Sequence, residues 1–138
     1  MPQVIDIQKE MDTRTFLEGR HVNTPPEELE AAFAELANYR DGGIFAGGFS
    51  GTSRWERHRN GDEIVHVLSG TTRLTIMRQS DMETFELTAG MMIIVPQGCW
   101  HRFESETGVR VMTVTPQPTD HTAADDPNET AGHASQGT

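Results

Sequence analysis

The chain has 138 residues, of which 35% are hydrophobic and 23% charged, and this length fits one domain with its own core. Its 21 acidic and 11 basic residues leave a formal charge of −10. That charge repels nucleic-acid phosphates and anionic membrane surfaces, so we expect neither as a partner. The single cysteine, Cys99, excludes an internal disulfide and a multi-cysteine zinc site.

No segment suggests insertion into a membrane or export. The longest strongly apolar run, from Met91 to Val95, is far shorter than the ~20 residues of a membrane span. Charged residues such as Asp6, Lys9 and Glu10 stand where a signal peptide has its apolar stretch. We therefore expect a soluble, cytoplasmic protein.

Residues 1–43 form an N-terminal segment in which one helix is predicted over residues 25–38. The sequence Thr24-Pro-Pro-Glu27 is typical of a helix start, with Thr24 as the cap and Glu27 closing a capping box. Apolar residues then recur at helical spacing until Asp41-Gly-Gly43; they are Leu29, Phe33, Leu36 and Ala37. We expect this helix to lay one apolar stripe on the main domain.

Residues 44–115 predict an all-β domain. β-branched and aromatic runs alternate with Gly-rich or polar turns, which include Asn60-Gly61, Ser69-Gly70, Ala89-Gly90 and Thr107-Gly108. The expected strands are 44–50, 53–58, 63–68, 72–78, 84–87, 91–95, 100–104 and 109–115. Many short strands without intervening helices indicate an antiparallel sandwich or barrel.

Residues 116–138 lose this periodicity and predict a flexible, acidic C-terminal tail. His121 and His133 fall in the tail, and we expect both to be solvated. His21 lies outside the strands and is expected to be solvated too.

Imidazoles and carboxylates gather around one predicted hairpin. Residues two apart on a strand face the same way, so Glu56 and His58 project from one face. The Asn60-Gly61 turn brings Glu63 back near His58, and His101 begins a later strand. Two imidazoles and two carboxylates that converge inside a barrel form a site for one divalent metal.

These residues resemble the first sequence motif of the cupin superfamily, G-x5-H-x-H-x(3,4)-E-x6-G. His58, Glu63 and Gly70 match its second half, while Glu56 stands where the family usually has its first His. Gly51 takes the place of the opening glycine, one residue nearer than the pattern asks.

The second cupin motif, G-x5-P-x-G-x2-H-x3-N, is matched by Gly90, Pro96, Gly98 and His101, with Ser105 in place of Asn. The resemblance covers residues 44–115. It implies a double-stranded β-helix of the jelly-roll type, often a homodimer, that binds one metal. Carried over by position, the metal ligands are Glu56, His58, Glu63 and His101.

If Glu56 binds the metal, its carboxylate changes the charge of the site. Two carboxylates, two neutral imidazoles and a divalent ion sum to zero, which attracts an anionic chelating substrate less than a cationic site does. Carboxylate oxygen favours Mn²⁺ or Fe²⁺, with Ni²⁺, Co²⁺ and Zn²⁺ also possible. Without metal, the carboxylates would repel and raise the pKa of at least one of them. We therefore expect metal removal to lower the melting temperature more than in a three-His site.

The resemblance implies a small mononuclear metal enzyme acting on a chelating organic substrate, with oxygenase-like or isomerase- and cyclase-like chemistry. Oxygenase, and hence oxidoreductase, chemistry is the first choice by family analogy alone, and no catalytic residue beyond the metal ligands is identified. The alternative is a cupin that binds a sugar or organic acid without chemistry. A regulatory subunit for DNA is disfavoured because only one good helix precedes the barrel.

The remaining candidates have simpler interpretations. We expect Trp55 and Trp100 to pack in the core or at a dimer contact, Cys99 to be a small buried residue, and His66 to face the outer side of the sheet. Phe103 and Ser105 share the parity of His101, which makes them candidates for lining the cavity. The arginines near the hairpin, Arg54, Arg57, Arg59 and Arg73, are expected to be solvated rather than bound to a substrate carboxylate. The methionines Met77, Met82, Met91 and Met92 are expected to fill the core.

Overall fold

The computed structural model describes residues 2–129 and 133–135. Its helices are α1 (Ile7–Asp12), α2 (Pro26–Ala32) and a 3-10 turn at Pro127–Glu129. Its strands are β1 (Leu17–Arg20), β2 (Phe33–Tyr39), β3 (Gly42–Thr52), β4 (Trp55–His58), β5 (Glu63–Arg78), β6 (Asp81–Thr88), β7 (Met92–Val95), β8 (Trp100–Pro116), β9 (Thr119–Thr122) and β10 (His133–Ser135). The predicted all-β fold is confirmed. None of these helices is long and apolar enough to cross a membrane.

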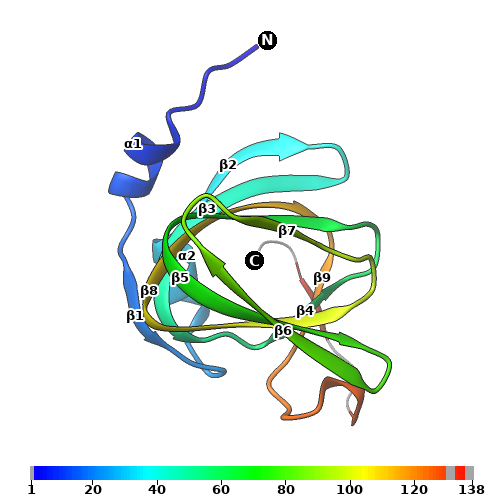
Figure 1. Ribbon diagram of the computed structural model, residues 1–138. Coiled ribbons are helices and arrows are strands. Elements are labelled where there is room, and N and C mark those ends of the chain that lie inside the picture. The colour runs from blue at the N-terminus through cyan, green and yellow to red at the C-terminus, as the bar shows by residue number, and fades with distance from the viewer. Residues whose placement is uncertain (1, 130–132, 136–138) are drawn as a thin grey trace.

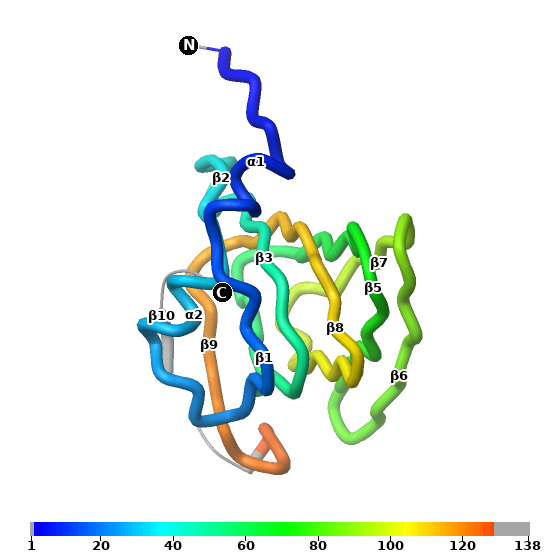
Figure 2. The backbone as a smooth tube through the Cα atoms, turned by 90° about the vertical axis from the view of Figure 1, so that its left-hand side faces the viewer, coloured from blue at the N-terminus to red at the C-terminus, as the bar shows by residue number. Residues whose placement is uncertain are grey.

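The strands curl into a barrel whose wall contains the two long strands β5 and β8 (Figure 1). β8 pairs antiparallel with β3, β4 and β5, and β5 also pairs with β6 and β7. Figure 2 shows β9 and α2 on one side of the barrel and β6 on the other. Burial alternates along the strands, as in β5, where Val65 and Val67 are fully buried and His66 faces outward. Inward side chains form the main core, which includes Phe49, Leu74 and Phe103.

The turns expected at Ser69-Gly70 and Thr107-Gly108 are not turns. Both lie inside long strands, β5 and β8, whose pairing shifts register beside Gly70. At Gly70 a Cβ would lie 2.2 Å from the carbonyl oxygen of Gly108. The glycines therefore mark a bend and a close approach of two strands rather than their ends.

The helix expected over residues 25–38 is wrong in its second half and at its cap. α2 ends at Ala32, and residues 33–39 form β2, which pairs with β3 from Phe33↔Gly47 to Tyr39↔Gly42. Backbone pairing with an open strand edge outweighs the helical spacing of a few apolar residues. Thr24 does not cap the helix, since its hydroxyl accepts a hydrogen bond from the His21 N–H instead.

The flexible tail is also a wrong prediction where the structure describes it. β9 pairs with β4 from Trp55↔Thr122 to His58↔Thr119, and His121 is buried rather than solvated. β10 adds a further strand beside β9. Residues 130–132 and 136–138 of the expected tail, and the side chain of His133, lie outside the described part of the chain.

The methionines divide between core and surface. Met77 packs with Trp55 and Trp100 in a second small core, which confirms the expected packing of both tryptophans. Met82, Met91 and Met92 are exposed, contrary to expectation. Met92 lies on the outward side of β7, and Met82 lies in β6, a strand with one buried residue, Leu87.

Candidate metal centre

Three strands bring His58, Glu63 and His101 together. His58 ends β4, Glu63 begins β5, and His101 lies near the start of β8, opposite Glu56 of β4 and Ile76 of β5. The three residues are 3%, 4% and 1% exposed. Among the described residues, their ligand atoms lie within 4.8 Å of one another. The cluster can therefore hold a metal ion.

The polar atoms of this cluster are better placed to bind a cation than to hydrogen-bond with one another. His58 Nε2 lies 3.3 Å and His101 Nε2 3.0 Å from the two carboxylate oxygens of Glu63. Within the described part of the chain, buried His58 Nε2 and Glu63 Oε1 have no hydrogen-bond partner of acceptable geometry. Buried polar atoms are rarely left unsatisfied, so this donor set fits a transition metal with nitrogen and oxygen ligands.

Neighbouring groups hold the ligands in place. His101 Nδ1 lies 3.1 Å from the carbonyl oxygen of Cys99, to which it donates as the protonated nitrogen, leaving a lone pair on Nε2. His58 Nδ1 lies 3.0 Å from the hydroxyl of Thr119, and Thr115 donates a 2.6 Å hydrogen bond to Glu63 Oε2. Such outer contacts fix ring orientation and raise the affinity of a metal site. The alternation of inward and outward residues along the predicted strands did not identify Thr115 or Thr119 as part of this site.

The site favours the ionised carboxylate. Burial opposes the ionisation of Glu63, but the neighbouring His58 and His101 outweigh it and hold its pKa below the usual range. Burial lowers the pKa of His101, yet its contact with Glu63 outweighs burial and raises that pKa overall. The pKa rise expected from carboxylate repulsion is therefore not found at Glu63.

Glu56 lies beside the cluster with different partners. It is buried, and its carboxylate oxygens lie 3.8 Å from Arg20 and 3.8 Å from His121 Nδ1. It lines one small cavity together with Arg20, Glu63 and His101, which has an open volume of about 20 Å³. That volume holds about one water molecule. Its oxygens are not among the clustered ligand atoms of the described residues, and its role as a ligand stays a prediction.

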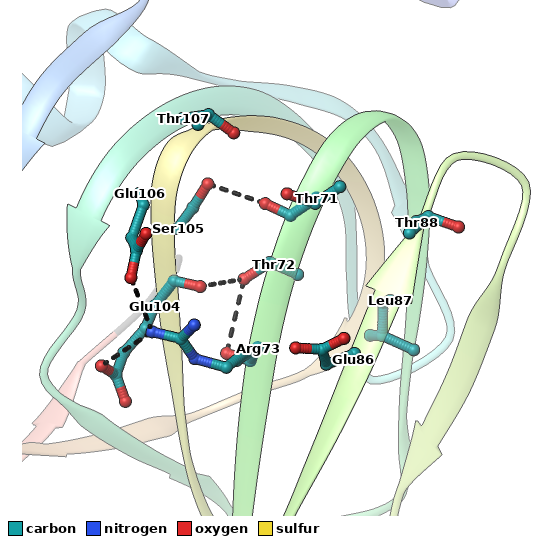
Figure 3. A pocket seen from close by; sticks show the side chains of 10 residues that line it. All are labelled: Thr71, Thr72, Arg73, Glu86, Leu87, Thr88, Glu104, Ser105, Glu106 and Thr107. Atoms are coloured by element: carbon teal, nitrogen blue, oxygen red, sulfur yellow. Dashed lines mark hydrogen bonds and ion pairs between the residues drawn. The ribbon is translucent and has the colours of Figure 1, made fainter.

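Of the two further residues expected in the cavity, one is there. Phe103 lines it, whereas Ser105 points elsewhere and bonds the carbonyl oxygen of Thr71 and the N–H of Gly108. Ser105 borders a larger outer pocket of about 200 Å³ between β5, β6 and β8 (Figure 3). This pocket shares no lining residue with the ligand cavity, and its Arg73 is paired with Glu104 and Glu106. It therefore belongs to the surface and not to the metal centre.

Arg57 and Arg59 anchor β9 through ion pairs, although Arg59 is exposed to solvent as expected and Arg57 is partly buried. Both bind the carboxylate of Asp120, which is fully buried, and Arg57 Nε lies 2.9 Å from its Oδ2. Burial opposes the ionisation of Asp120, but the two arginines outweigh it and lower its pKa. Thr119 directly precedes Asp120. The ion pairs of Asp120 therefore also hold the Thr119 hydroxyl beside His58.

We expect Asp120→Asn to lower the free energy of unfolding by about 1–3 kcal/mol, because hydrogen bonds between charged groups are lost. The contribution of a carboxylate with a lowered folded pKa is present above its unfolded pKa of about 3.9 and lost as pH falls through the folded pKa. The difference between Asp120→Asn and wild type should therefore be constant above about pH 5 and shrink below about pH 4. Urea unfolding across this range measures it, with Asp125→Asn, an exposed position, as the control. A difference that does not change with pH would contradict the assignment.

Comparison with known proteins agrees with this fold. The family described as Cupin_2, cupin domain, matches residues 45–115. A solved cupin-2 domain containing protein from Shewanella frigidimarina is similar in fold, with a TM-score of 0.52 and 24% identity over 62% of this chain and 80% of that one. No curated protein matches the sequence of this chain.

Two structures of metal proteins are also similar. Hydroquinone 1,2-dioxygenase PnpCD, solved with Cd²⁺ and 4-hydroxybenzonitrile, gives a TM-score of 0.54 at 16% identity over 69% of this chain and 67% of that one. Oxalate decarboxylase from Bacillus subtilis, studied for its Mn(II) centres, gives 0.54 at 16% identity over 64% of this chain and 26% of that one. At these identities the likeness shows the fold alone.

Proposed function

Because the chain belongs to the cupin family, we propose that it is a mononuclear metal protein, and an enzyme acting on a small organic substrate that chelates the metal. The observation that carries the proposal is the buried cluster of His58, Glu63 and His101, whose ligand atoms converge and include two without hydrogen-bond partners among the described residues. Similar folds with Mn(II) centres or bound Cd²⁺ support it. Mn²⁺ or Fe²⁺ remains the favoured ion, with Ni²⁺, Co²⁺ and Zn²⁺ as alternatives.

A bound metal would supply Lewis-acid or redox chemistry at a chelated oxygen. The residues of the chain do the rest. His58, Glu63 and His101 would hold the ion, Thr115 orients the Glu63 carboxylate, and apolar side chains such as Phe49 and Phe103 limit the entry of water. The similar dioxygenase favours oxygenase-like chemistry, with isomerase- or cyclase-like chemistry as the next choice.

A non-catalytic binding protein is the second candidate, and one observation favours it. Among the described residues that line the cavity, the titratable groups other than Glu63 and His101 are Glu56 and Arg20. A binding protein for a small acid needs no further acid or base. Turnover that depends on metal separates the two candidates.

The first test is metal content by elemental mass spectrometry, on protein purified without a nickel column. We expect near one Mn or Fe per chain in the wild type and a loss of at least about tenfold in His58→Ala, because one of the clustered ligands is gone. His66→Ala is the matched control, since His66 lies on the outer face of β5. Wild-type protein that stays metal-free after reconstitution would contradict the proposal. If metal binds, oxygen uptake with small chelating substrates follows.

We also propose that the protein is a homodimer and that it is located in the cytoplasm. Met92 and Ile94 are exposed apolar side chains on the outer face of β7, and a second copy that covered them would remove apolar area from water. Sedimentation should then show a dimer for wild type and a monomer for Ile94→Glu. A wild-type monomer at micromolar concentration would contradict the dimer, and cell fractionation tests the location.

A further inference from the structure

Arg20 is a buried cation that the sequence analysis did not single out. It ends β1, pairs with Gly51 of β3, and is 7% exposed. Its guanidinium carbon lies 4.8 Å from the ring centroid of Phe49 and 5.3 Å from that of Phe33. Two aromatic rings therefore hold the guanidinium in one place.

The guanidinium has a distant ion-pair partner. It carries five N–H donors, and its ion-pair partner, Glu56, lies 3.8 Å away, beyond hydrogen-bond distance. Among the described residues, the guanidinium also contacts the rings of Phe33 and Phe49. A buried cation whose ion-pair partner lies this far away is costly for stability, and an anion bound beside it would lower that cost.

Arg20 also changes the charge of the cavity that it shares with Glu56, Glu63 and His101. With neutral imidazoles, two carboxylates and a divalent ion sum to zero, and the guanidinium adds one positive charge. The occupied cavity is therefore cationic, not neutral as the sequence predicted. Its open volume holds about one water molecule, so a carboxylate would displace that water and require the lining side chains to move apart.

We propose that Arg20 is a substrate-binding residue that receives the carboxylate of a small monoanionic organic acid, while a second oxygen of that acid reaches the metal. This inference rests on the proposed function, because it needs a metal at His58, Glu63 and His101. A guanidinium and a carboxylate match in shape and charge and form two parallel hydrogen bonds. In this arrangement Glu56 is an internal competitor for Arg20.

The test uses Mn²⁺-loaded protein and two probes of nearly equal shape, glycolate and its neutral amide, glycolamide. Displacement of metal-bound water, followed by water proton relaxation, reports their binding. We expect wild type to bind glycolate at least about tenfold more tightly than glycolamide. Arg20→Gln should lose this preference and keep its Mn²⁺, whereas Glu56→Gln should bind glycolate more tightly than wild type. Arg110→Gln is the matched control, since Arg110 also stacks on a ring, that of Phe16, but is exposed outside the cavity.

The outcomes separate this inference from the proposed function. An Arg20→Gln protein that keeps Mn²⁺ and the full preference for glycolate overturns the inference alone. Wild-type protein that binds no Mn²⁺ overturns the proposed function and the inference with it. If Arg20→Gln does not fold, Glu56→Gln decides the question, because unchanged or weaker glycolate binding in that variant contradicts the competition for Arg20.

Discussion

Manganese at about a thousand times its dissociation constant should raise the melting temperature of the wild-type protein by roughly 12–20 °C. Binding to the folded state alone contributes about 4 kcal/mol at that excess, and for this length each kcal/mol corresponds to roughly 3–5 °C. The folded chain offers the site because β4, β5 and β8 bring together ligands that lie up to 43 residues apart, from His58 to His101. The unfolded chain has no such cluster.

Glu63→Gln should reduce this shift to about a third or less at the same manganese concentration. The amide keeps the size of the side chain but removes the charge that balances the ion and that lies between both imidazoles. We expect metal affinity to fall by at least about 100-fold, more than for loss of an outer contact such as that of Thr115. Differential scanning fluorimetry of both proteins, with Mg²⁺ as a control for ionic effects, measures the difference. An equal shift in both proteins would place the metal elsewhere.

The cluster of His58, Glu63 and His101 could be predicted from the sequence because its placement depends on local rules. Strand parity puts His58 on the inward face of β4, and a short turn returns the chain to Glu63. The second motif then sets His101 just after a Pro-x-Gly turn. The same parity placed Phe103 in the cavity, but it failed at Ser105, where β8 approaches its register shift against β5.

Arg20 and Asp120 could not be predicted in this way, because each is placed by pairing between distant parts of the chain. β1 reaches the cavity through a parallel pairing with β3, more than 25 residues later, and no local pattern announces such a pairing. β9 is held by Arg57 and Arg59, about 60 residues earlier. In both cases a polar, aperiodic stretch is ordered by tertiary contacts that outweigh its composition.

The same limit explains the charge of the site. The charges of Glu56, Glu63 and a divalent ion sum to zero, and the defined positions of the two cupin motifs contain no further cationic residue that would change this sum. The structure places Arg20 beside Glu56 and packs it between Phe33 and Phe49, which the sequence analysis assigned to a helix stripe and to a strand. The electrostatics of the cavity therefore depend on the N-terminal segment, outside the region that the family shares.

Gly51→Ala tests this dependence and should cost about 3–4 kcal/mol of unfolding free energy. Gly51 has φ +102°, and a Cβ there would lie 2.1 Å from the carbonyl oxygen of Arg20. A side chain at positive φ costs roughly 1–2 kcal/mol, and the clash adds the cost of moving β1 off β3. Gly90→Ala is the matched control, because Gly90 has φ +88° and no atom within 4 Å of the added Cβ. Urea unfolding of both variants isolates the clash, and equal losses would contradict it.

The two variants should differ in binding as well. The ligands His58, Glu63 and His101 lie on β4, β5 and β8, so folded Gly51→Ala should still bind Mn²⁺. Arg20 is displaced with β1, so the preference for glycolate over glycolamide should fall at least about tenfold in Gly51→Ala and stay unchanged in Gly90→Ala. Such a result would show that a glycine outside the cavity controls its charge by letting β1 approach. Retention of the preference in Gly51→Ala would mean that β3 yields to the added methyl group instead, with β1 and Arg20 left in place.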